Sequence, residues 1–289
     1  MKHLIRFDWA IKRLLRNKAN YVILEGFLSE LLGDDIKIDS ILESESNKQA
    51  SDSKTNRVDI LVQNKNGELL IIEFQNNFQS DYLLRMLFGT SKLLVDNMDE
   101  GLTYSMIKKI ISINIVYFDL GQGEDYIYHG TTNYVGMHTG DILNLSFREK
   151  IYYPTDRISK IYPEYYIIKV NKFDQIAVTP LEEWINFLKK EEVNKNTMAK
   201  GLKEAKAKIE TLKKNKDEMR EYEWYIQNER DFLSQQYSNF LEGERKGREE
   251  GIKENKIEIA LKCIQKGMFL SDIVELTGLP EDEIRSLKV

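Results

Sequence analysis

The sequence predicts an α/β protein in which a β-sheet is flanked by helices and is followed by an α-helical C-terminal region. Three observations support this prediction. Two apolar runs joined by a turn occupy residues 57–79, an amphipathic helical pattern covers 80–97, and another run rich in β-branched residues covers 108–118. Beyond about residue 191 the pattern changes to long helices rich in Glu and Lys. Strands and helices that alternate in this way are typical of an α/β sheet.

The composition allows one or two folded domains and limits where the protein works. The chain has 289 residues, of which 42% are apolar and 10% aromatic, so a sizeable core can form. Its single cysteine, Cys263, gives no disulfide framework and no cysteine-based zinc site. The sequence has no secretory signal and no apolar run of membrane-spanning length. We therefore expect a cytoplasmic protein without membrane contact, with a folded domain at 1–190 and a helical tail at 191–289.

The first 33 residues predict two helices. Apolar residues recur at helical spacing, and Asn20 is suited to cap a second helix at 21–32 that ends at Gly33. Glu25 lies in this second helix among apolar neighbours. On the helical pattern alone, Glu25 is more simply a residue of a solvated helix face than a functional carboxylate.

The hairpin at 57–79 follows an extended segment at 36–42 and a polar run at 43–56 that predicts a mobile loop. The second strand of the hairpin is almost entirely apolar, which suits a central strand covered on both faces. Asp59 and Glu73 are therefore unusual, because a carboxylate in an apolar strand is costly unless a charged partner compensates it. A metal ion is the usual partner for such carboxylates.

The register of this hairpin can be predicted from two independent requirements. Asp59 and Glu73 can share a metal only if they stand opposite each other on one face of the sheet. This register also places Asn64 opposite Glu68 and leaves a three-residue loop that ends at Gly67. Such a loop needs a left-handed residue in its last position, which glycine supplies. A two-residue Asn-Gly loop is the competing arrangement, and it would put the two carboxylates on opposite faces.

The helix predicted at 80–97 carries the basic residues nearest to the hairpin. Arg85 and Lys92 are seven residues apart and therefore share a face. The net charge of −5 gives no general attraction for nucleic acid, so contact with DNA requires a local basic surface. We expect Arg85 and Lys92 to contribute to it. The alternatives are that Arg85 pairs with the site carboxylates and that Lys92 is an ordinary surface residue.

After the strand at 108–118, the first region continues with three aromatic-rich runs that we expect to extend the sheet and form its edge strands. These runs cover residues 125–130, 150–154 and 164–170. Pro180 then opens a further helix, because proline is favoured in the first turn.

The region from 191 to 289 is expected to form a solvated helical bundle or coiled coil. Gly243, Gly247 and Gly251 place small residues on one helix side. The segment at about 255–289 has helix-turn-helix spacing, but few basic residues accompany it. We therefore favour self-association over DNA reading for this tail, and expect a homo-oligomer formed through the C-terminal helices.

The hairpin residues form a set suited to phosphodiester hydrolysis. One or two Mg²⁺ ions held by carboxylates can supply the activated water and neutralise the developing charge, and Mn²⁺ is an alternative ion. We expect Asp59 and Glu73 to be the metal ligands, with the Phe74 carbonyl as a third oxygen. Gln75 is expected to hydrogen-bond the attacking water or a phosphate oxygen.

The pattern of Asp59 followed by Glu73-x-Gln75, behind a helical Glu25, resembles the PD-(D/E)xK nuclease superfamily. Several stretches narrow the resemblance to the recombination-promoting nuclease and transposase-like family: FDWAIKRLL, VDILVQ, IIEFQ, GERKGREEG and IALKCIQKG. The resemblance implies a restriction-endonuclease-like core with a mixed central sheet. It also implies Mg²⁺-dependent DNA endonuclease activity linked to recombination or mobile elements. Under the resemblance, Asp59, Glu73, Gln75 and Glu25 are the catalytic set.

Two departures from the superfamily pattern bear on activity. Val58 stands where proline is usual, which leaves the neighbouring carboxylate unchanged. Gln75 stands where lysine is usual, and a neutral amide supplies no positive charge to the transition state. Two alternatives therefore stay open: a catalytically weak or inactive DNA-binding or assembly protein that acts through its helical tail, and an enzyme that cleaves RNA.

Overall fold

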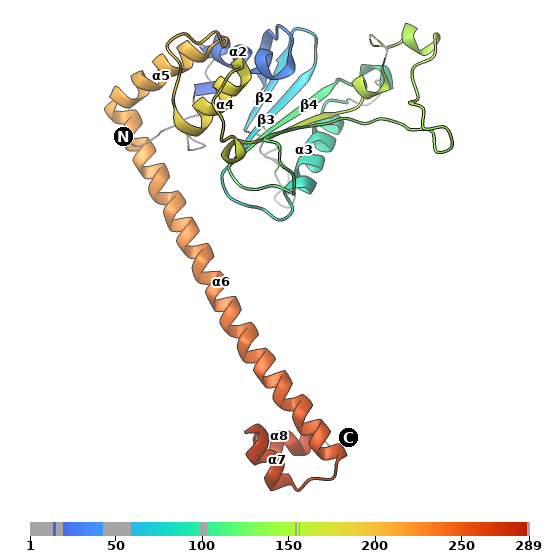
Figure 1. Ribbon diagram of the computed structural model, residues 1–289, viewed down its shortest axis with the longest axis vertical. Helices are drawn as coiled ribbons and strands as arrows, with labels where there is room; N and C mark the ends of the chain where they lie inside the picture. Colours follow the sequence, from blue (N-terminus) through green and yellow to red (C-terminus); the bar gives the residue numbers. More distant parts are fainter. Residues whose placement is uncertain are drawn as a thin grey trace. The chain divides into compact units, whose positions relative to one another are not determined.

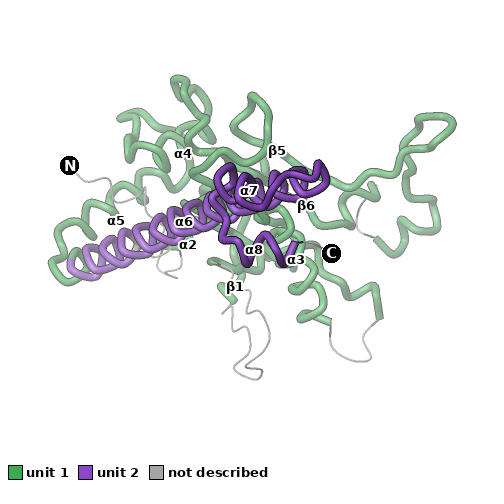
Figure 2. The backbone as a smooth tube through the Cα atoms, turned by 90° about the horizontal axis from the view of Figure 1, so that it is seen from below, with its two compact units in different colours: residues 1–219 green, residues 220–289 purple. Residues whose placement is uncertain are grey.

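The computed structural model describes residues 14–15, 20–42, 59–98, 103–153, 155 and 157–287. The chain forms two compact units, residues 1–219 and 220–289 (Figure 2). The division differs from the boundary expected after residue 190, because the helix that follows residue 201 packs with the first unit. Among the described residues, no helix combines the length and apolar character needed to cross a membrane.

A six-stranded mixed sheet forms the centre of the first unit. The strand order is β1-β2-β3-β4-β6-β5. Strands β1, β2 and β3 pair antiparallel, β3, β4 and β6 pair parallel, and β5 returns antiparallel at the edge. The strand bounds are β1 Ile38–Leu42, β2 Ile60–Asn64, β3 Leu69–Gln75, β4 Ile110–Val116, β5 Ile127–Gly130 and β6 Glu164–Lys169. Every residue of β4 is buried, as expected for a central parallel strand.

Within the described part of the chain, four α-helices accompany the sheet: α2 Tyr21–Leu32, α3 Tyr82–Asp96, α4 Pro180–Lys190 and α5 Leu202–Lys214. Figure 1 shows α3 on one side of the sheet and α2 with α4 on the other. The ring of Phe27 in α2 meets the Trp184 ring of α4 edge-on at 5.6 Å. On the opposite side, Tyr82 and Met86 of α3 pack against Val116 of β4. The predicted helices at 21–32, 80–97 and after residue 180 are therefore confirmed.

The ends of these helices follow the local sequence. Gly33 takes a left-handed conformation with φ of 74° and ends α2. Asn20 occupies the N-cap position, but its side chain donates to the Leu14 carbonyl and does not cap the helix. At α4, Thr179 and Glu182 form a reciprocal capping box, which satisfies backbone donors at the helix start.

The predicted hairpin register is confirmed. Ile60 pairs with Ile72 and Gln63 pairs with Leu69, so the position opposite Asp59 is Glu73. The Gly67 N–H donates to the Asn64 carbonyl at 2.9 Å, and Gly67 has φ of 81°. The turn is therefore the three-residue loop that keeps both carboxylates on one face.

The connections contain short 3-10 helices: η2 Tyr104–Met106, η3 Glu149–Ile151, η4 Ile158–Lys160 and η5 Val170–Lys172. Two of the three aromatic-rich runs are strands, β5 and β6, but the prediction for 150–154 was wrong. The described residues of that segment, 150–153, begin in η3 and are exposed, because they have no adjacent strand to pair with among the described residues. Most of the predicted first helix and the loop expected at 43–56 lie outside the described residues.

The second unit contains most of α6 Lys216–Gln265, together with α7 Leu270–Thr277 and α8 Glu281–Ser286. The end of α6 packs with α7 and α8 around a small core: Ala260, Cys263, Ile273, Leu279 and Ile284. Gly278 separates the two short helices in a left-handed conformation. The first turn of α8 carries three acidic residues, which is unsuited to a DNA backbone.

Residues 199–201 are tied to α2 by a close backbone approach at Gly26, and this contact predicts a stability effect. A Cβ added at Gly26 would lie 2.5 Å from the Lys200 carbonyl carbon. We expect Gly26→Ala to lower the free energy of unfolding by about 2–3 kcal/mol, despite alanine's higher helix propensity. Urea denaturation measures this change.

Gly247→Ala is the matched control, because an added Cβ there meets nothing within 4 Å. We expect this substitution to be neutral or to stabilise the long helix by up to about 1 kcal/mol. Equal effects of the two substitutions would contradict the close packing of α2 against residue 200.

Candidate functional site

The site begins at the open end of the β2–β3 hairpin. Asp59 directly precedes β2, and its Oδ2 accepts a hydrogen bond from the Phe74 backbone N–H at 2.8 Å. Glu73 is the residue opposite Asp59 in the hairpin register. Opposed residues of an antiparallel pair have Cα atoms about 4.5–5.5 Å apart, with side chains on one face. The fold therefore holds the two carboxylates side by side, and the hydrogen bond to the Phe74 N–H fixes the Asp59 carboxylate next to Glu73.

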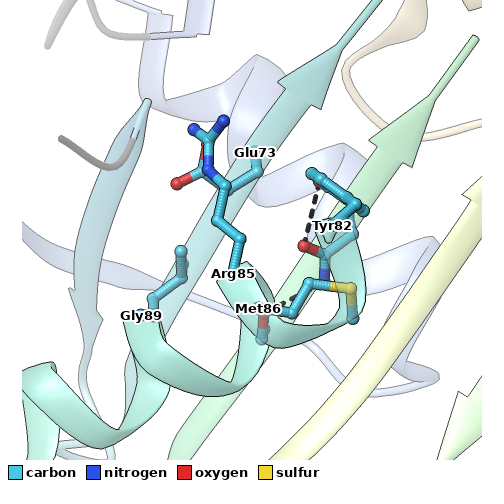
Figure 3. A pocket seen from close by; sticks show the side chains of 8 residues that line it. Glu73, Tyr82, Arg85, Met86 and Gly89 are labelled. Atoms are coloured by element: carbon cyan, nitrogen blue, oxygen red, sulfur yellow. Dashed lines mark hydrogen bonds and ion pairs between the residues drawn. The ribbon is translucent and has the colours of Figure 1, made fainter. Parts of the chain in front are cut away.

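Glu73 lies under α3 in a largely buried position. Its residue surface is 9% exposed, and its Oε2 lies 3.6 Å from Nη2 of Arg85. Figure 3 shows Arg85 rising from α3 toward Glu73 on the neighbouring strand. The two border a small pocket with a cavity volume of about 10 Å³, lined by Ile71, Glu73, Tyr82, Arg85, Met86, Gly89, Ser112 and Asn114. Arg85 therefore sits where a cation compensates the charge of a carboxylate that solvent barely reaches.

The neighbouring strand β4 adds a polar pair that the sequence analysis missed. Asn114 pairs with Glu73 in the parallel register. The Asn114 Oδ1 accepts from the Tyr82 hydroxyl at 3.2 Å, and its Nδ2 donates to Ser112 Oγ at 3.0 Å. The signal was present in the sequence, because Ser112 and Asn114 alternate with isoleucines in an otherwise apolar strand. Buried polar side chains with this spacing lie on one face of the strand.

Tyr82 remains a hydrogen-bond donor in this environment. Burial raises the pKa of its hydroxyl far above the ordinary value, and the negative charge of Glu73 raises it further. The protonated hydroxyl fixes the Asn114 amide by donating to its oxygen. Asn114 is in turn held by Ser112 and the Tyr166 carbonyl, so the floor of the pocket is rigidly hydrogen-bonded.

Gln75 and Phe74 complete the end of β3. Gln75 shares a strand face with Glu73, and its Nε2 donates to the Asn77 carbonyl at 3.0 Å. The Phe74 N–H points toward Asp59, and the N–H and carbonyl of one strand residue face the same side. The Phe74 carbonyl therefore faces the edge from which Asp59 projects, as the predicted third oxygen ligand requires.

Glu25 is not brought to this site. Its Oε1 accepts from the Ile38 N–H at 2.9 Å, and its Oε2 lies 3.3 Å from Lys37 Nζ. Ile38 pairs with Asn64, at the turn end of the hairpin. That level is roughly 16 Å along the strand from Asp59 at about 3.3 Å per residue. In this position the Glu25 carboxylate satisfies a backbone donor at the start of β1, away from the two opposed carboxylates, and its catalytic role stays a prediction.

The two basic residues expected to contact DNA have different surroundings. Arg85 lies beside Glu73 and also donates from Nη1 to the Gln79 side chain at 3.2 Å. Lys92 lies two turns further along α3, where its Nζ is 3.5 Å from Asp96. A surface pair of this kind is weak and leaves a lysine available to other anions.

The donor set fits a hard divalent cation with an incomplete protein shell. Within the described ranges, no group of three or more His, Cys, Asp or Glu side chains converges. Two carboxylates and one carbonyl are nevertheless suited to Mg²⁺, which is commonly held by one or two carboxylates together with waters and substrate phosphates.

A mixed sheet flanked by helices, with two carboxylates at the open end of a central hairpin, is a restriction-endonuclease-like α/β fold. A family model described as PD-(D/E)XK nuclease family transposase matches residues 5–237, and the chain belongs to that family. At the family level this means a hydrolytic nuclease that uses a divalent metal. Comparisons with curated proteins and with solved structures gave no match.

Proposed function

We propose that the protein is a Mg²⁺-dependent DNA endonuclease, with Mn²⁺ as an alternative ion, that acts in the cytoplasm on recombining or mobile DNA. The observation that carries the proposal is the hairpin register, which sets Asp59 opposite Glu73 and fixes Asp59 on the Phe74 N–H. Family membership supplies the reaction class.

Each residue of the site has a part in the proposed reaction. Asp59, Glu73 and the Phe74 carbonyl would hold the divalent ion, which when bound acidifies a water and polarises the scissile phosphate. Gln75 orients the attacking water through its amide, since it ends the same strand on the same face. Asn114 and Tyr82 keep the base of the pocket fixed, which limits the movement of Glu73.

Arg85 is suited to two partners in turn. Without substrate its guanidinium compensates Glu73. When the Glu73 carboxylate is engaged by a metal ion, the same guanidinium can hydrogen-bond a phosphate oxygen, a geometry that arginine favours. Arg85 thereby supplies from α3 the positive charge that is absent from β3, where Gln75 stands in the position usual for lysine. Lys92 would extend the basic path along α3.

The tail is proposed to self-associate through α6. Several large apolar side chains of this helix are exposed: Trp224, Phe232, Leu233, Tyr237, Phe240 and Leu241. Leu233, Tyr237 and Phe240 share a helix face with the glycines at 243, 247 and 251, so the expected homo-oligomer has an apolar surface available.

The test of the proposed function is metal-dependent cleavage by the full-length protein. We expect nicked and linear products from supercoiled plasmid with Mg²⁺ or Mn²⁺, and intact plasmid with EDTA, because the two carboxylates cannot activate water without the ion. Agarose gels at matched protein concentration measure the products. A folded single-stranded RNA in parallel reactions reports whether RNA is the preferred substrate.

Cleavage that persists in EDTA would contradict the proposal. So would an intact plasmid together with an unchanged melting temperature when Mg²⁺ or Mn²⁺ is added, since an ion that binds the native state must stabilise it.

A further inference from the structure

The outward side of α3 is an uncharged and largely apolar surface, defined here as the α3 outer face. Five large side chains on it are exposed: Leu83 (56%), Leu84 (69%), Leu87 (55%), Phe88 (47%) and Val95 (72%). They recur at the spacing of one side of a helix, and the position between them is Ser91. No charged residue interrupts this face.

The inward side of the same helix is already apolar and buried. Tyr82, Met86, Gly89 and Thr90 face the sheet. Apolar residues therefore cover two sides of α3, and its charged residues Arg85, Lys92 and Asp96 lie in a stripe between them, whereas an ordinary surface helix has a polar outer face. Scattered exposed leucines are ordinary, but contiguous exposed apolar patches of this kind mark interaction sites.

We propose that the α3 outer face binds the same face of a second copy of this chain. The absence of charge excludes nucleic acid as the occupant, since a phosphate backbone is bound through Lys and Arg. An uncharged surface is by contrast complementary to itself, as a two-fold interface requires. Arg85 and Lys92 lie beside this face on α3, where they stay available to DNA.

The area is sufficient for such a contact. Five side chains that each expose about half of their surface or more present roughly 500 Å², at the upper end for one patch on a monomer. Burying that patch on both copies removes about 1,000 Å², which is the lower bound for a specific interface. Phe78, also exposed and directly before α3, would add to it.

The α3 outer face is separate from the tail surface proposed above, so the experiment must distinguish the two. We expect the double substitution Leu84→Glu with Leu87→Glu to halve the molar mass of the full-length protein at micromolar concentration. Light scattering after size-exclusion chromatography measures the mass. Parent, variant and control all carry Tyr237→Glu and Phe240→Glu in α6, because a tail contact that joins the same two copies would otherwise hide the loss of the α3 contact.

Ile176→Glu with Val178→Glu is the matched control, since both residues are apolar and exposed in the first unit away from α3. We expect this variant to keep the mass of the parent. Circular dichroism checks that both variants are folded.

Two results would overturn the proposal. One is a monomeric parent protein. The other is a folded α3 variant whose mass equals that of the parent and of the control. A monomeric parent whose α3 variant melts at a lower temperature would assign the face to a segment of the same chain, such as residues 1–13.

Discussion

Replacement of Glu73 by glutamine is expected to lower the rate of metal-dependent DNA cleavage by about 100- to 1,000-fold, since a metal ion contributes several kcal/mol of charge stabilisation and each 1.36 kcal/mol is tenfold in rate. The substitution keeps the shape of the side chain and removes only its charge. Asp59→Asn should have a similar effect, because asparagine retains an oxygen that can accept from the Phe74 N–H. Initial rates on supercoiled plasmid measure both losses.

Glu68→Gln is the matched control for these substitutions. Glu68 lies in the same hairpin, but at its turn end, where the carboxylate accepts from the Asn64 amide at 2.7 Å. We expect this variant to cleave at the parent rate.

Binding of the ion gives a second readout that does not depend on turnover. Mg²⁺ or Mn²⁺ should raise the melting temperature of the parent and of Glu68→Gln, but not that of Glu73→Gln or Asp59→Asn. Parent-like cleavage by both site variants would show that the opposed carboxylates are not the metal site, whatever the fold of the core.

The hairpin was predictable because two constraints of different origin agreed. Gly67 fixes the loop through its positive φ, and the requirement that Asp59 and Glu73 share a face fixes the register. The glycine alone leaves the two-residue Asn-Gly loop as a competitor, and the requirement that the two carboxylates share a face excludes that loop. The amphipathic helices were predictable for a simpler reason, since their caps and periodicity are local.

The features that the sequence did not reveal depend on long-range pairing. The sequence does not show which end of the hairpin Glu25 approaches. Glu25 accepts a hydrogen bond from Ile38, and only the pairing of Ile38 with Asn64 shows that this contact lies at the turn end, away from Asp59. Asn114 becomes a site residue only because β4 lies parallel to β3 in the register that sets it beside Glu73. Strand order and register across 40 residues of chain are tertiary properties that no local pattern contains.

The two compact units divide at a different residue from the change in composition, for a related reason. The composition changes near residue 191, but a solvated helix can still bury one narrow stripe. Helix α5 is rich in lysine and glutamate, yet Leu202, Ala205 and Ile209 are buried. The few buried residues of such a stripe hardly change the composition of the whole segment, so the composition does not reveal them.

Truncation of the chain at two different residues is expected to show which part of the C-terminal region the core needs in order to fold. A chain that ends after residue 190 should not fold, because it loses the buried residues of α5: Leu202, Ala205, Ile209 and Leu212. Each buried leucine or isoleucine contributes roughly 1.5–3 kcal/mol, so their sum approaches the 5–15 kcal/mol that stabilises a typical domain. The Trp184 Nε1–H would also lose its acceptor, the Lys200 carbonyl at 3.1 Å. Loss of the cooperative urea transition measures this effect.

A chain that ends after residue 230 should fold and should cleave plasmid with Mg²⁺ at a rate near that of the full-length protein. It retains the whole first unit and the start of α6, including the buried Tyr222. Comparable cleavage by this shorter chain would contradict the alternative in which the protein acts through its tail. If the shorter chain folds and still shows the metal-induced rise in melting temperature, but no longer binds or cuts DNA, the tail and not the hairpin controls engagement with the substrate. The chain that ends after residue 190 therefore tests whether the core needs α5 to fold. The chain that ends after residue 230 tests whether the core needs the tail for activity.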